Sequence, residues 1–174
     1  MLQYFSNNNR KEITYMKYKS INELDKFNLH DTELEKIKFD GKDMIWILKN
    51  ANVTVKNSQN NNKNDMFVNM MKLTFKNIKI KNFVWLSSET RDEIGNLVEQ
   101  TKCIEVKEQN SINELKKSLK RYCYILGDKE IKNKEQYSYL FTMNTEEGVF
   151  EFILLFKTAV AEWNEYSGKS WYEE

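Results

Sequence analysis

The 174-residue chain has no proline, only five glycines, two cysteines and a single histidine. Each glycine interrupts a run of patterned residues, as expected at turns and helix ends, because glycine tolerates positive φ at little steric cost. The cysteines, Cys103 and Cys123, are far apart and lack the spacing of metal ligands. We therefore expect both to be reduced thiols of a cytoplasmic protein.

Other absences bear on function. No apolar run reaches the roughly 18 residues of a membrane-spanning helix, and the polar N-terminus lacks the apolar core of a secretion signal. The sequence has no glycine-rich phosphate loop, GxSxG elbow or HExxH motif, so it predicts no cofactor and no metal. The 27 basic and 26 acidic residues nearly balance. Because nucleic-acid binding depends on a basic excess, we expect neither nucleic acid nor membrane as a partner.

Aromatic residues, by contrast, make up 13% of the chain and occur in tight clusters that can supply a core. The length fits one folded unit. We predict a single domain over residues 16–174, preceded by a flexible N-terminal extension over residues 1–15. Met16 is the alternative natural start.

Alternating side chains predict strands and hairpins. "ELEKIKF" and "DMIWILK" flank "DGKD", and "YSYLFTM" is followed by "VFEFILLF". The repeated "SINEL" has the serine and glutamate of a capping box and predicts helices at about 20–27 and 111–126. The asparagine-rich segment 56–65 predicts a mobile loop. The predicted class is α+β, with about seven or eight mostly antiparallel strands forming a sandwich or a partly closed barrel.

The only histidine, His30, directly precedes Asp31 at the end of the first predicted helix. A histidine oriented by a carboxylate can act as a general base, so His30, Asp31 and Glu33 are the catalytic candidates. Adjacent residues of an extended segment point to opposite faces, and the pair can interact only if the chain turns there. Asp31, Glu33 and Glu35 share one face of such a segment, where they could collect Ca²⁺ or Mg²⁺. The structural alternative is that Asp31 binds backbone N–H groups at a corner.

A second candidate is the aromatic C-terminus. Its members lie within ten residues of one another and are separated by polar ones: Trp163, Tyr166, Trp171 and Tyr172. Exposed tryptophan and tyrosine dominate protein interfaces, so the cluster is a candidate binding surface. The alternative is that it folds back and caps an open end of the sheet.

The run "NLHDTELEKIKFDGKDMIWIL", residues 28–48, resembles small uncharacterised proteins of low-GC Gram-positive bacteria in which a short helix leads into Leu-His-Asp and a hairpin. Some similar proteins are grouped with immunity proteins of bacterial toxin systems. The ending "EWNEYSGKSWYE", residues 162–173, is similar to the C-terminus of such proteins. The resemblance implies importance for four positions: Leu29, His30, Asp31 and Trp163.

Three functions remain open at this point. The first is a non-catalytic binding module for a protein partner, including an immunity-type protein that occludes a toxin. The second is a metal-dependent hydrolase or other enzyme centred on His30 and Asp31. The third is a structural subunit that self-associates through an open sheet edge. The sequence leaves the oligomeric state undetermined.

Overall fold

The computed structural model describes residues 16–118, 123–133 and 135–173. The predicted extension over residues 1–15 lies outside this part of the chain. The elements in chain order are β1 (Tyr18–Ile21), η1 (Leu24–Lys26), β2 (Phe27–Asn28), β3 (Thr32–Asp40), β4 (Asp43–Val53), β5 (Met66–Lys76), β6 (Lys79–Trp85), β7 (Glu89–Arg91), β8 (Leu97–Gln100), β9 (Ile104–Val106), η2 (Glu108–Asn110), α1 (Ser111–Ser118), β10 (Cys123–Glu130), β11 (Tyr137–Thr145), β12 (Gly148–Phe156), β13 (Thr158–Trp163), β14 (Gly168–Lys169) and η3 (Trp171–Glu173).

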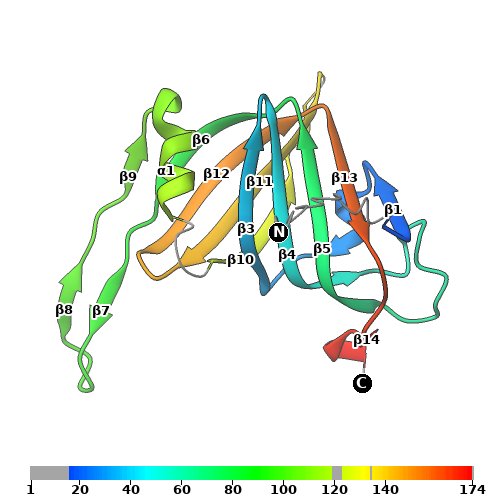
Figure 1. The fold of residues 1–174 in the computed structure, drawn as a ribbon. Coiled ribbons are helices and arrows are strands. Elements are labelled where there is room, and N and C mark those ends of the chain that lie inside the picture. Colours follow the sequence, from blue (N-terminus) through cyan, green and yellow to red (C-terminus); the bar gives the residue numbers. More distant parts are fainter. Residues whose placement is uncertain (1–15, 119–122, 134, 174) are drawn as a thin grey trace, which may run out of the picture.

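Twelve of these strands form one sheet, in the order β1-β13-β5-β4-β3-β10-β11-β12-β6-β9, with β2 beside β4 and β14 beside β5. The described pairs are antiparallel, as the sequence predicted. Only Lys157 separates β12 from β13, and its N–H donates to the carbonyl of Lys76, 2.9 Å away, where β5 ends. The sheet therefore curls back on itself around its core (Figure 1).

The predicted hairpin around "DGKD" is confirmed. Strands β3 and β4 pair from Asp40 opposite Asp43, and Gly41 between them has a φ of +58° that a glycine adopts readily. In β4, Met44 and Trp46 are fully buried. The strand lies between β3 and β5, which is a central position in the sheet.

The second predicted hairpin is confirmed as β11 and β12. Phe141 lies opposite Phe152, and both rings are fully buried. The ring centre of Phe141 is 4.9 Å from that of Trp46 on β4, and Phe75 on β5 is 5.0 Å from Trp46. Because these rings come from distant parts of one sheet, the core is the interior of the curl.

The predicted helix over residues 20–27 is wrong. Residues 18–21 form β1, and only Leu24–Lys26 form a single 3₁₀ turn. The Ser20 hydroxyl donates to the Glu23 carboxylate, 2.6 Å away, and Glu23 in turn accepts the Ser58 hydroxyl at 2.7 Å. The two capping-box side chains thus bind each other and a distant loop, so they do not satisfy the N–H groups of a helix start.

The predicted helix over residues 111–126 is correct only in its first half. Helix α1 spans Ser111–Ser118, and residues 119–122 lie outside the described chain. From Cys123 the chain is strand β10, and Gly127 stands at a register shift of that strand instead of a helix end. In the sequence, Leu115, Tyr122 and Leu126 keep a helical spacing, but Cys123 and Ile125 alternate as in a strand, and pairing with β3 and β11 selects the strand.

The predicted α+β class with about seven or eight strands and two helices is therefore wrong. Over the described residues the protein is mostly antiparallel β, with a twelve-stranded sheet, a two-stranded sheet and one α-helix. Within the same residues, no helix has the length and apolar character needed to cross a membrane.

The asparagine-rich segment is held by side-chain hydrogen bonds, in contrast to the predicted mobile loop. Asn57 and Asn60 are buried. The Asn57 amide donates to the Ser20 hydroxyl at 3.1 Å, and the Asn60 amide donates to the carbonyl of Val53 at 3.0 Å. Asparagine here supplies buried polar contacts, which composition alone does not distinguish from solvated loop residues.

Candidate functional site

The first predicted site, His30 and Asp31, lies at a tight turn between β2 and β3. The N–H of Thr32 donates to the carbonyl of Leu29 at 3.0 Å, and Asp31 has a φ of +61°. The turn brings His30 Nδ1 within 2.9 Å of Asp31 Oδ2. The two residues thus form the contact that a straight strand would have prevented. The Asp31 N–H also donates to the carbonyl of Ile125, 2.8 Å away on β10.

The surroundings of this pair are open. The side chains of His30 and Asp31 are 57% and 62% exposed. Glu33, the third catalytic candidate, points to Lys49, whose Nζ lies 3.7 Å from Glu33 and 2.9 Å from Glu35. The carboxylates predicted to share one face therefore divide between a histidine and a lysine. Among the described residues, no three His, Cys, Asp or Glu side chains are grouped so that they could hold a metal ion.

Two of the four C-terminal aromatics pack inward. Trp163 is fully buried, with the ring of Tyr18 stacked at 5.5 Å and that of Phe27 edge-on at 5.9 Å. Tyr166 donates its hydroxyl to the carbonyl of Gln59 at 2.9 Å, and burial raises its pKa to about 12. These two residues close the end of the core near β1.

The other two remain accessible. Trp171 is 70% exposed, and Tyr172 packs edge-on against it with ring centres 5.3 Å apart. The Tyr172 hydroxyl donates to Asp65 Oδ2 at 3.1 Å, and the Ser170 N–H donates to the Asp65 carbonyl at 2.9 Å. The C-terminal segment is thus fixed to the start of β5, and its exposed ring pair is available for contact.

A third surface was not found by sequence reasoning. Residues 87–106, here called the arm, comprise β7, β8 and β9 with their connections, and the β7–β8 ribbon projects from the body of the sheet (Figure 1). Its tip is well formed, because Asp92 Oδ1 accepts the N–H groups of Ile94 at 3.1 Å and Asn96 at 2.8 Å. The hydrogen bond from the Asn96 side chain, together with these backbone bonds, holds the pKa of Asp92 below its usual value.

The arm exposes aliphatic side chains. Ile94 is 84% exposed and Val98 is 65% exposed, and Leu97 and Ile104 are also exposed. Within the described chain, β7 and β8 pair only with each other. The sequence signal for this surface is the presence of Ile94, Leu97 and Val98 around the Gly95 turn without nearby aromatic residues to cover them.

The arm is also acidic. It carries five acidic residues against two basic ones, a net charge of −3. They are Glu89, Asp92, Glu93, Glu99 and Glu105, with Arg91 and Lys102. Apart from an ion pair of 2.9 Å between Arg91 and Glu89, no salt bridge joins these charges within the part of the chain described.

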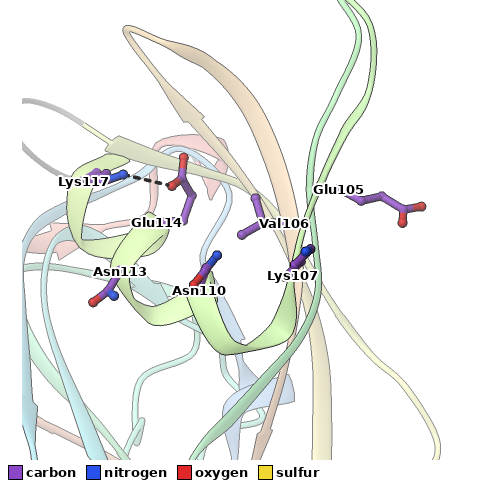
Figure 2. A pocket seen from close by; sticks show the side chains of 7 residues that line it. All are labelled: Glu105, Val106, Lys107, Asn110, Asn113, Glu114 and Lys117. Atoms are coloured by element: carbon purple, nitrogen blue, oxygen red, sulfur yellow. Dashed lines mark ion pairs between the residues drawn. The ribbon is translucent and has the colours of Figure 1, made fainter.

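A groove of about 730 Å³ lies between the base of the arm and α1, lined by Glu105, Val106, Lys107, Asn110, Asn113, Glu114 and Lys117 (Figure 2). Lys117 Nζ lies 3.6 Å from Glu114 Oε2 across one helix turn, and the indole N–H of Trp85 donates to Glu114 Oε1 at 3.2 Å. Glu114 therefore fixes α1 against β6. The Glu105 side chain points away from the helix in Figure 2.

Over residues 16–118, 123–133 and 135–173, the fold and these surfaces define a mostly antiparallel β protein with one short α-helix and an exposed acidic hairpin. No protein-family model, curated protein or solved structure matches the chain.

Proposed function

We propose that the protein is a non-catalytic protein-binding module whose principal contact surface is the arm. The observation that carries the proposal is the exposure of Ile94, Leu97 and Val98 on the β7–β8 ribbon, which projects from the sheet, and of Ile104 on β9 at its base. A two-stranded ribbon is marginally stable alone, and exposed aliphatic patches mark interaction sites. A partner that covers the arm would remove this apolar surface from water.

The resemblance of residues 28–48 to immunity-type proteins supports a narrower version, in which the partner is a toxin that the arm occludes. Leu29 is fully buried, which is consistent with a structural role for this motif. We propose the cytoplasm as the location. The proposal is supported by two cysteines without a disulfide, Cys103 exposed and Cys123 buried. The exposed Trp171 and Tyr172 pair is the proposed second contact.

The contact between His30 and Asp31 favours one alternative, an enzyme in which Asp31 orients His30 as a general base. A metal-dependent hydrolase would be stabilised by its ion. A melting temperature unchanged by Ca²⁺, Mg²⁺, Mn²⁺ and Zn²⁺ would remove the metal-dependent version of this alternative. An increase that is lost in Asp31→Asn would favour it over the binding module.

Cys103 allows a direct test of the binding module. Burial raises the pKa of Cys123 to about 12, so at neutral pH a maleimide photo-cross-linker attaches to the exposed Cys103 alone. The matched control carries Cys103→Ser and Lys42→Cys, which moves the label to an exposed turn between β3 and β4.

The two labelled proteins are irradiated in extracts of cells that express the chain naturally, and the adducts are identified by mass spectrometry. We expect one dominant protein adduct from Cys103 that is absent from the control and that binds saturably when purified. The same adducts from both positions would contradict the proposal that the arm is the contact surface.

A further inference from the structure

We propose that the arm binds an extended basic segment of its partner as an added strand along the free edge of β8 and β9. The inference rests on the proposed function and specifies the chemistry of the partner. An extended peptide that joins a sheet edge gains affinity from main-chain hydrogen bonds and specificity from alternate side chains.

The edge itself is the first observation. β9 pairs with β6 on one side, through Val106 opposite Phe83 and Ile104 opposite Trp85, and stands at the end of the sheet. β8 pairs with β7 on one side in the same way. Between described residues, no backbone hydrogen bond reaches the outer side of β9. The outward N–H and C=O groups of such a strand are a template for a further strand.

The groove beside α1 lies next to the end of β9, on the side where α1 packs against β6. Asn110 and Asn113 contribute amide groups that can donate to or accept from a peptide, and Val106 contributes an apolar floor. About 730 Å³ of space accommodates several side chains of a strand.

The charge of the arm indicates which kind of segment would bind along this edge. The arm has a net charge of −3 in a chain of +1, so two arms paired edge to edge would place acidic residues against acidic residues. A segment that alternates lysine or arginine with aliphatic residues would instead meet Glu99 and Glu105 with one face. Its other face would cover Ile104, which alternates with Glu105 along β9. A basic partner segment is thus favoured over a second copy of the chain.

The probe for this inference is a fluorescein-labelled eight-residue peptide of alternating lysine and valine, added to the full chain at low salt. One control peptide carries glutamate in place of every lysine. A second control peptide carries proline in place of the two central valines. Proline lacks the N–H that strand addition requires. By fluorescence anisotropy we expect the lysine peptide to bind at least about tenfold more tightly than either, with an affinity that falls as salt rises.

The double variant Glu99→Lys, Glu105→Lys should weaken binding of the lysine peptide by about tenfold or more. The matched control Glu165→Lys changes an exposed residue of the C-terminal loop. It should leave the affinity for the lysine peptide within about twofold of the wild-type value. Equal binding of all three peptides, or none by the lysine peptide, would overturn the inference. A dimer that forms with rising concentration in sedimentation would make a second copy the occupant.

The two proposals fail in different ways. A Cys103-specific protein adduct with no binding of the lysine peptide would refute the basic-strand chemistry and leave the binding module standing. Absence of a Cys103-specific adduct would instead refute the arm as the contact surface of the binding module.

Discussion

Asp31 forms the turn beside His30 with a φ of +61°. Glycine adopts this conformation freely, whereas other residues rarely do. We expect Asp31→Gly to retain the free energy of unfolding within about 0.5 kcal/mol and Asp31→Ala to lose about 1 kcal/mol. His30→Ala should lower the free energy of unfolding by less than about 0.5 kcal/mol, since the side chains of His30 and Asp31 are both exposed. Urea denaturation measures all three. A larger loss in His30→Ala would show that the pair itself stabilises the turn.

Asp128 on β10 should make stability depend on pH. Burial raises the pKa of Asp128 to about 6, so the folded protein holds this proton more tightly than the unfolded chain. The resulting stabilisation is complete below about pH 4 and is lost as pH rises through about 6. At pH 8, Asp128→Asn should therefore be more stable than the wild type by up to about 3 kcal/mol, and at pH 3.5 the two should agree. A pH-independent difference in urea denaturation would contradict this assignment.

Trp163 and Trp171 are chemically identical but differ in burial. Trp163 is fully buried against Tyr18 and Phe27, whereas Trp171 is 70% exposed. We expect Trp163→Ala to cost about 3–5 kcal/mol of unfolding free energy and Trp171→Ala less than about 0.5 kcal/mol. Thermal and urea denaturation of both variants provide the measurement. Similar losses would mean that the exposed ring also stabilises the fold.

Among the elements, the β7–β8 ribbon should be separable from the rest of the protein. The N–H of Ser88 donates to Thr101 Oγ1 and that of Thr101 to the carbonyl of Ser88, both at 2.9 Å, so these two residues close the ribbon at its base. Replacing residues 89–100 with Asn-Gly should preserve the hairpin, because that pair favours a two-residue turn. We expect the free energy of unfolding to change by less than about 1 kcal/mol, since β7 and β8 are exposed throughout.

Circular dichroism and urea denaturation measure the effect of replacing residues 89–100. The lysine peptide should no longer bind to this variant. A loss of several kcal/mol would show that the arm belongs to the stable body of the sheet. Retained peptide binding would place the contact at the groove beside α1 alone.

Elements differ in how well the sequence predicts them. The hairpins β3–β4 and β11–β12 were predictable because their partners are adjacent in sequence and a short polar turn with a glycine separates two strand-like segments. The helix over 111–126 was predicted too long because Leu115, Tyr122 and Leu126 keep a helical spacing in the sequence, whereas pairing with β3 and β11 makes Cys123–Glu130 a strand. The Ser20 and Glu23 pair shows that capping chemistry serves loops as well as helices.

The order of strands across the whole molecule was beyond prediction. Tyr18 pairs opposite Trp163, and Thr32 opposite Ile125, over separations that alternation does not encode. The same limit applies to predicting the candidate sites from the sequence. Composition identified His30, Asp31 and the aromatic cluster, whereas the arm depends on which strands are left without a neighbour. The aliphatic residues around Gly95 are visible in the sequence, but their exposure depends on how the sheet is assembled.

The way the sheet curls around one core predicts that the protein unfolds cooperatively. β12 and β13 continue across Lys157, and one connected core includes Trp46 and Trp163. Because the curl offers no boundary at which it could divide, residues 16–174 should unfold as the single domain expected from the sequence. Tryptophan fluorescence and far-ultraviolet circular dichroism should give the same urea midpoint, and the calorimetric and van't Hoff enthalpies should agree. Separate midpoints would instead show that the β1 end, around Trp163, and the β11–β12 end are independent units.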